Sequence, residues 1–122
     1  MRLRESGEMY LETVLLLSEK GEHVRSLDVA NHLGFSKPSV SRAVGKLKSE
    51  NYINIDQQGY ITLTDKGESI AKKILEKRKV LKDLIMSLGV DEETAAADAC
   101  KIEHVLSDKT FEALKESRKT SI

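Results

Sequence analysis

The spacing of apolar residues in this chain changes from helical to alternating and back again, and these changes indicate the order of elements that the fold must contain. Up to Ser49 apolar side chains recur at helical spacing, in stretches that end at Gly21, at Gly34 and near Ser49 itself. Between residues 53 and 63 they alternate with polar residues around the turn sequence DQQGY, which predicts a β-hairpin. Helical spacing then returns. The predicted order is three helices, a hairpin and further helices.

The first three helices are short, and each has a recognisable beginning or end. We expect them at residues 8–20, 26–33 and 36–49, with Ser26 and Ser36 as N-caps. Pro38 is tolerated in a first turn because its missing N–H would have no helical partner there. The predicted buried side chains of the second and third helices are Leu27, Ala30 and Leu33, and Val40, Val44 and Leu47.

Two longer helical segments follow the predicted hairpin. One stops at Gly89, and the other runs from Asp91 to about Ser107, before a polar tail with the sequence KESRKTSI. The fold class is therefore mostly α, and its first part has the order of a winged helix-turn-helix. Apolar residues expected to serve both an internal core and a dimer interface are Leu81, Leu84, Ile85, Leu88, Val105, Leu106, Phe111 and Leu114.

Net charge gives this chain no general attraction for nucleic acid, but one helix is locally basic. The 20 Lys and Arg residues balance the 20 Asp and Glu residues, so attraction requires a local patch. The third helix contains cations and no acid, and in a winged helix-turn-helix this helix enters the major groove. A solvated basic face is the alternative, and the order of elements favours double-stranded DNA. Predicted contacts are Arg42 to bases, Ser39 to a base edge or a phosphate, and Lys37, Lys46 and Lys48 to phosphates.

A thiol, a carboxylate and an imidazole occur close together near the C-terminal end. Cys100, Glu103 and His104 stand at i, i+3 and i+4, on one face if the segment is helical. Sulfur, oxygen and nitrogen donors suit a divalent transition metal. The alternative is structural: Cys100 is a small buried side chain, Glu103 pairs with Lys101 or Lys109, and His104 caps a neighbour. These residues alone leave both interpretations open.

Four segments resemble the iron-dependent repressor family, which contains the diphtheria toxin repressor and the manganese transport regulators. They are GEMYLETVLLL, SKPSVSRAVGKL, ITLTDKG and LGVDEETAAADACKIEHVLSD, and the similarity covers residues 6 to about 108. The resemblance implies a winged helix-turn-helix DNA-binding domain at 1–67 and a helical metal-binding and dimerisation domain at 68–122. It also implies a homodimer that binds a pseudopalindromic operator when metal is present.

The same resemblance implies which residues bind metal. Met9, Cys100, Glu103 and His104 match the ligands of the iron-responsive branch, and Glu12 matches an acid that binds a second metal in the manganese branch. Because a thioether and a thiolate are soft donors, the set suits Fe(II), Co(II), Ni(II) or Zn(II) better than Mn(II). Ferrous iron is the expected metal.

The chain departs from the family pattern at the second metal site. Arg78 stands where that site has a histidine, and another histidine of the iron branch falls at Ala96. We therefore expect one ion per chain. Our hypothesis is that a cation from residues 77–79 takes the space of the second ion and pairs with Glu12 or Glu103. The alternative is that these cations face solvent.

Other protein classes are less compatible with the sequence. Cys100 is the only cysteine, which excludes an internal disulfide, and the longest strongly apolar run, from Val14 to Leu17, is too short to cross a bilayer. The first ten residues hold no apolar stretch like that of a secretion signal, so a cytoplasmic protein is expected. An enzyme is disfavoured because HExxH, a phosphate-binding glycine loop and a nucleophile elbow are missing. The main alternative is a winged-helix regulator that needs no metal.

Overall fold

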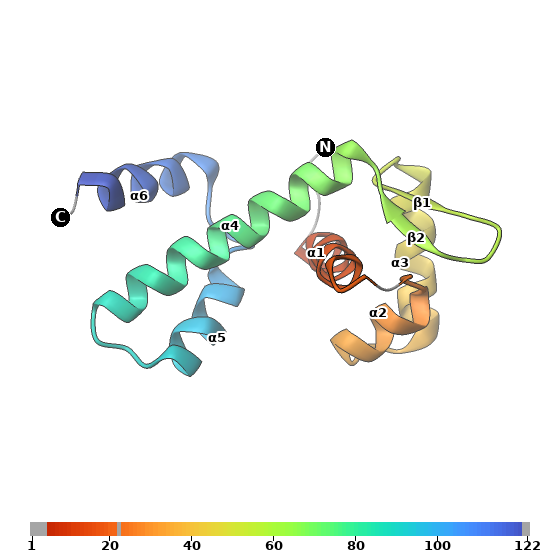
Figure 1. The fold of residues 1–122 in the computed structure, drawn as a ribbon, viewed down its shortest axis with the longest axis horizontal. Helices are drawn as coiled ribbons and strands as arrows, with labels where there is room; N and C mark the ends of the chain where they lie inside the picture. Colours follow the sequence, from red (N-terminus) through yellow and green to blue (C-terminus); the bar gives the residue numbers. More distant parts are fainter. Residues whose placement is uncertain (1–4, 22, 121–122) are drawn as a thin grey trace. The chain divides into compact units, whose positions relative to one another are not determined.

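The structure, a computed structural model, describes residues 5–21 and 23–120, and within them the chain forms six helices and one two-stranded sheet (Figure 1). The elements are α1 Glu5–Glu19, α2 Ser26–Leu33, α3 Lys37–Ser49, β1 Ile53–Ile55, β2 Ile61–Leu63, α4 Asp65–Ser87, α5 Glu92–Ile102 and α6 Asp108–Thr120. The predicted order and the mostly α class are confirmed. The chain divides into two compact units, residues 1–72 and 73–122, and α4 contributes to both.

The first unit is a winged helix-turn-helix, as predicted. α1 contacts α2, α3 and β2 around a core that includes Leu11, Val29 and Val40, each with no exposed surface. The strands β1 and β2 pair antiparallel, with Ile53 opposite Leu63. Ile61 N–H donates to the carbonyl of Val24 at 2.7 Å, which attaches the segment before α2 to the hairpin. The wing is thereby fixed to the three-helix core.

The two helices of the helix-turn-helix differ in how they begin. Ser36 caps α3 as predicted, because its Oγ accepts the backbone N–H of Ser39 at 3.4 Å. Ser26 is not the cap of α2. Arg25 takes that position, and its backbone N–H donates to Asp28 Oδ2 at 2.9 Å, which starts the helix at Ser26. The buried residues of α2 are then Val29 and Ala30, whereas Leu27, predicted to be buried, is 48% exposed.

A close approach of backbones fixes the start of α4 against the hairpin. Thr64 Oγ1 accepts the N–H of Gly67 at 3.1 Å and donates to the carbonyl of Asn51 at 2.8 Å. Gly67 packs directly on Tyr52, and a Cβ at this position would overlap the Tyr52 carbonyl oxygen. The motif ITLTDKG therefore carries a helix cap and a glycine that the packing requires.

The second unit packs α5 and α6 against the later part of α4 (Figure 1). Ala95 and Ala99 of α5 have no exposed surface, and Phe111 of α6 is 1% exposed. The buried positions of α5 thus carry small side chains, and one large aromatic anchors α6. Of the residues expected to serve a core and an interface, Leu81 and Phe111 are buried, whereas Leu88 and Val105 are 77% and 71% exposed.

The helix predicted from Asp91 to about Ser107 is shorter in the structure, and a further helix follows it. α5 ends at Ile102, residues 103–107 form a turn, and α6 follows where a polar tail was expected. Ser107 Oγ accepts the backbone N–H of Thr110 at 3.1 Å, which caps α6. The tail prediction was wrong because α6 is largely polar in sequence: among its side chains that the structure describes, Phe111 alone is fully buried. Among the helices of the described residues, none is long and apolar enough to span a membrane.

Candidate metal centre and nucleic-acid interface

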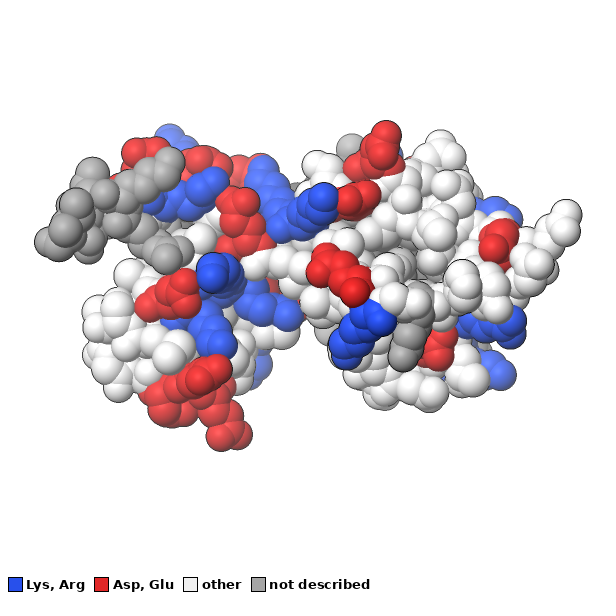
Figure 2. All heavy atoms as spheres, in the orientation of Figure 1, with Lys and Arg blue, Asp and Glu red and all other residues white. Residues whose placement is uncertain are grey.

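One side of α3 is apolar and buried, and the other carries the predicted DNA contacts. Val40, Val44 and Leu47 lie in the core. Arg42 is exposed, and its Nη2 donates to Ser39 Oγ at 3.5 Å, so these two side chains lie together on the outer face. Lys37, Lys46 and Lys48 are also exposed, whereas Ser39 is half-buried. Both signs of charge are mixed on the face that Figure 2 shows. The sequence of α3 itself contains cations and no acid.

A cation near the wing, Arg25, was not predicted to contact it. The ring of Tyr60, beside β2, stacks on His23 with centroids 4.4 Å apart, and the Arg25 guanidinium carbon lies 4.7 Å from the same ring. Asp56 Oδ1 accepts the backbone N–H groups of Gln58 and Tyr60, each at 2.9 Å, which closes the wing turn. Arg25 is exposed. The only sequence feature that could have indicated an exposed Arg25 is its position directly before α2, and nothing in the sequence indicates its contact with Tyr60.

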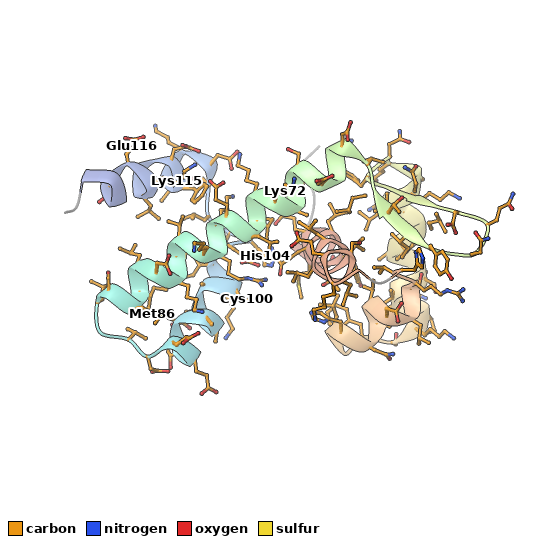
Figure 3. The ribbon with its side chains drawn as sticks, viewed as in Figure 1. Lys72, Met86, Cys100, His104, Lys115 and Glu116 are labelled. Atoms are coloured by element: carbon orange, nitrogen blue, oxygen red, sulfur yellow. The ribbon has the colours of Figure 1, made fainter. Side chains whose placement is uncertain are left out.

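Three predicted metal ligands lie near the C-terminal end of α5, and the structure brings the donor atoms of two of them, Glu103 and His104, close together. Cys100 lies in α5, Glu103 is its C-cap with helical backbone angles, and His104 lies in the following turn. The prediction that one helix carries all three was therefore wrong, although the backbone of Glu103 keeps helical angles. His104 Nε2 lies 3.3 Å from Glu103 Oε1. Figure 3 labels Cys100 and His104, which lie alongside α4.

A bidentate ion pair holds the Glu103 carboxylate. Arg78 of α4 donates from Nε to Oε2 at 2.8 Å and from Nη2 to Oε1 at 2.9 Å. The same Nη2 lies 3.8 Å from Cys100 Sγ. The predicted pairing of a cation from residues 77–79 with Glu103 is confirmed, and the alternative partners of Glu103, Lys101 and Lys109, are wrong. The resemblance placed Arg78 here, since helical spacing alone cannot relate α4 to α5.

Burial and charge act against each other in this pair. The Glu103 side chain has no exposed surface, and this burial raises the pKa of its carboxyl, while the Arg78 hydrogen bonds and charge offset part of the increase. Burial also lowers the pKa of Arg78, but the hydrogen bonds and charge of Glu103 outweigh it and raise that pKa. The guanidinium is therefore a permanent positive charge beside two donor atoms.

A lysine network supports the turn that carries His104. Lys77, 6% exposed, donates to the carbonyl of Leu106 at 3.0 Å and lies 3.4 Å from Asp108 Oδ1. Lys73 lies 3.0 Å from Asp108 Oδ2, and its hydrogen bond lowers the pKa of that carboxyl. These contacts fix residues 104–108 between α5 and α6, so the chain itself holds the donor atoms of the turn in place.

The donor set fits a divalent transition-metal ion. A thiol, a carboxylate and an imidazole are the side chains from which such sites are built. The two remaining predicted ligands lie one turn apart on α1: Met9, whose carbonyl accepts the Thr13 hydroxyl at 2.8 Å, and Glu12, which is 5% exposed. Met9 and Glu12 therefore share one helix face.

Comparison with known proteins matches both units to one family. Residues 2–61 match the iron dependent repressor N-terminal DNA binding domain, and residues 64–119 match the metal binding and dimerisation domain of the same family. Both models describe a transcriptional repressor, not an enzyme.

Individual relatives agree with the family models. An uncharacterized HTH-type transcriptional regulator of Methanocaldococcus jannaschii is 39% identical over 115 residues, which cover 93% of this chain and 92% of that protein. The iron-dependent repressor IdeR of Mycobacterium tuberculosis is 30% identical over 87% of this chain and 46% of its own length. The structure of the manganese regulator SloR superimposes with a TM-score of 0.82 and 28% identity, over 98% of this chain and 55% of that one. This chain thus spans about half of IdeR and SloR. The chain belongs to the iron-dependent repressor family of metal-dependent transcriptional regulators.

Proposed function

We propose that this protein is a repressor that binds operator DNA as a homodimer when a divalent metal, Fe(II) as the expected ion, occupies a site that includes Cys100, Glu103 and His104. The observation that carries the proposal is the fully buried Glu103 carboxylate, which lies 3.3 Å from His104 Nε2 and shares the Arg78 guanidinium with Cys100. They lie in the part of the chain that matches the metal binding and dimerisation domain. Relatives named for iron and for manganese are both similar to the chain, so the donor chemistry is the argument for iron.

The proposed ligands have distinct roles. Cys100 and His104 supply soft and borderline donors, which favour Fe(II) over Mn(II), and Glu103 supplies negative charge. When bound, the metal supplies a positive centre that ties these side chains together. By the family resemblance Met9 completes the set from α1, and Glu12 is the acid available for a harder ion. A ligand on α1 would connect the metal to the unit that contains α3.

That connection suggests how metal controls DNA binding. A two-fold dimer contacts half-sites about one turn of DNA apart, near 34–36 Å, so the spacing of its two α3 helices determines affinity. The metal changes this spacing only to the extent that it binds the competent arrangement more tightly than the others. By thermodynamic linkage, operator DNA must then tighten metal binding by the same factor.

Exposed apolar side chains of the second unit support the homodimer. Leu88 and Val105 are 77% and 71% exposed, and Met86 is 37% exposed. A second copy of the chain that covers such residues gains the free energy of burying apolar surface. In the proposed dimer the two α3 helices each present Arg42 and Ser39 to bases, with Lys37, Lys46 and Lys48 near phosphates.

The test counts metal ions and then asks whether they matter for DNA. Anaerobic equilibrium dialysis against Fe(II), Mn(II) and Zn(II) is expected to give one tightly held ion per chain. Cys100→Ser is expected to lose this ion, whereas Lys101→Ala, an exposed neighbour on α5, keeps it. Two ions per chain would contradict the single site, and no bound metal would contradict the metal-dependent function.

The DNA probe for the second step is a duplex selected from a random pool, with and without metal. Metal-loaded wild type is expected to enrich a pseudopalindromic sequence. Its binding to that duplex, followed by fluorescence anisotropy, is expected to depend on added metal. Cys100→Ser is expected to bind that duplex with or without metal to the same extent. A wild-type protein that binds its selected duplex equally well without metal would instead establish the metal-independent regulator.

A further inference from the structure

We infer that the Arg78 guanidinium is a resident cation of the proposed metal centre. In the metal-free protein its Nη2 holds the place between Cys100 Sγ and Glu103 Oε1, and the metal must displace it to bind. Arg78 would then set the metal concentration at which the regulator responds. This inference deepens the proposed function and rests on the ligand roles of Cys100 and Glu103.

The first argument is the position of one nitrogen atom. Arg78 Nη2 lies 2.9 Å from Glu103 Oε1 and 3.8 Å from Cys100 Sγ, and the same Oε1 lies 3.3 Å from His104 Nε2. One positive group therefore already contacts two of the three donors. A metal bonded to both would lie about 2.0–2.2 Å from the oxygen and about 2.3 Å from the sulfur. Because Nη2 already lies beside both atoms, we expect a metal bonded to both and the guanidinium to exclude each other.

The second argument is that the acid of this pair is fully buried, whereas the guanidinium is partly exposed. Glu103 has no exposed surface, whereas the Arg78 side chain is 27% exposed. A carboxylate in such a place needs a positive partner, because the cost of removing it from water is otherwise uncompensated. Arg78 meets that need without metal, and its partial exposure gives the guanidinium a route outward when a metal replaces it. The exchange keeps Glu103 compensated throughout.

Neighbouring cations of α4 serve other partners. Lys77 bonds to Leu106 and Asp108, and Lys82 forms a 3.0 Å pair with Glu92, a side chain that is 71% exposed. Lys82 lies about one turn from Arg78 on the same helix and carries the same charge. Because the Lys82 pair is away from the donor atoms, Lys82 gives a matched control for the removal of one cation from α4.

The experiment measures metal affinity, not repression. Arg78→Gln removes the charge but keeps an N–H donor for Glu103, and Lys82→Gln makes the corresponding change at the surface pair. Co(II) is the probe, because a bound thiolate gives an absorption band that reports Cys100 directly. Competition with a chelator is expected to show about tenfold tighter Co(II) binding for Arg78→Gln, the size typical of groups bonded to metal ligands. Lys82→Gln is expected to match wild type. Unchanged or weaker binding by Arg78→Gln would overturn the inference.

Failure of this inference is distinguishable from failure of the proposed function. If wild type binds Co(II) with the thiolate band and Cys100→Ser loses the band, the metal site stands whatever Arg78 does. If wild type shows no thiolate band, the proposed site and the role of Arg78 both fall.

A second measurement uses wild type alone and does not require a variant to fold without Arg78. The Nε–Hε group of Arg78 is protected from exchange with water while it bonds to Glu103, and its NMR signal is assigned in wild type from through-bond correlations along the Arg78 side chain. Binding of one Zn(II) per chain is expected to speed this exchange, because the guanidinium leaves the carboxylate. An exchange rate that stays the same or slows would show that Arg78 remains in place, and the inference would be wrong.

Discussion

The two charged regions of the molecule differ in what surrounds their cations. On α3, Arg42 and the three lysines are exposed and face water. Beside α5, Arg78 is mostly enclosed and forms a bidentate pair with a carboxylate that has no exposed surface. The exposed cations lose little when a partner is missing, because water and salt ions solvate them. The enclosed pair has no such substitute.

This difference separates two kinds of function. An exposed basic helix can bind and release a long polyanion, since each contact is individually weak and the contacts add together. A buried pair is suited to act as a switch, because a carboxylate that loses Arg78 must gain another cation or a proton. Substitutions on α3 should therefore change DNA binding with little effect on folding, and substitutions beside α5 should change folding itself.

The largest expected effect is on the stability of the metal-free protein. Arg78→Met leaves Glu103 buried without its partner and is expected to lower the free energy of unfolding by about 3–5 kcal/mol. Glu103→Gln should cost less, about 1–3 kcal/mol, because the partly exposed Arg78 can turn toward water. Urea unfolding of the metal-free proteins, followed by circular dichroism, measures both changes.

The control for these two variants is Lys82→Met, which breaks the pair with exposed Glu92. Its effect is expected to stay within about 0.5 kcal/mol, as for other surface pairs. Equal losses for Arg78→Met and Lys82→Met would show that burial does not distinguish the two pairs. A larger loss for Glu103→Gln than for Arg78→Met would show that the guanidinium, not the carboxylate, is the group that needs compensation.

The same contrast explains what the sequence predicted well. The helices and hairpin of the first unit follow from local signals: apolar spacing, the Ser36 cap and the turn around Gly59. The basic face of α3 follows from its sequence alone, because exposed side chains need no partner elsewhere in the chain. Local signals also brought Cys100, Glu103 and His104 together as candidate ligands.

What the sequence could not predict depends on contacts between distant segments. The pairing of Arg78 with Glu103 requires α4 and α5 to pack together, and only the family resemblance pointed to it. The helix α6 was missed because one buried aromatic, Phe111, gives too weak a periodic signal among polar residues. The stack of Arg25 on Tyr60 joins the start of α2 to the wing, and neither segment alone indicates it.

A smaller effect is expected on α3, where it should appear in DNA binding and not in folding. Arg42→Ala is expected to weaken specific binding by about 1–3 kcal/mol and to relax preference at one base pair, because a bidentate contact to a base is lost.

Lys48→Ala should weaken binding to all duplexes similarly and reduce the dependence of this binding on salt. Anisotropy titrations with selected and scrambled duplexes separate these outcomes. Unchanged sequence preference in Arg42→Ala would remove Arg42 from base recognition, and a loss of stability comparable to that of Arg78→Met would break the contrast between the regions.

The smallest effect concerns Asp108, which combines features of both regions because it is exposed but pairs with the nearly buried Lys77. The hydrogen bond from Lys73 lowers the pKa of the Asp108 carboxyl in the folded state. An acid whose pKa is lower when folded contributes stability above its unfolded pKa of about 3.9 and loses it as the pH falls through the folded value. The Asp108 side chain is 65% exposed, so solvent screening limits the contribution to about 0.5 kcal/mol.

Wild type is therefore expected to be slightly more stable than Asp108→Asn at neutral pH, and the difference should vanish in strong acid. Urea unfolding at a series of pH values measures this difference. A difference that persists below the folded pKa would mean that Asp108 supports α6 through its shape and hydrogen bonds, and that its charge contributes nothing.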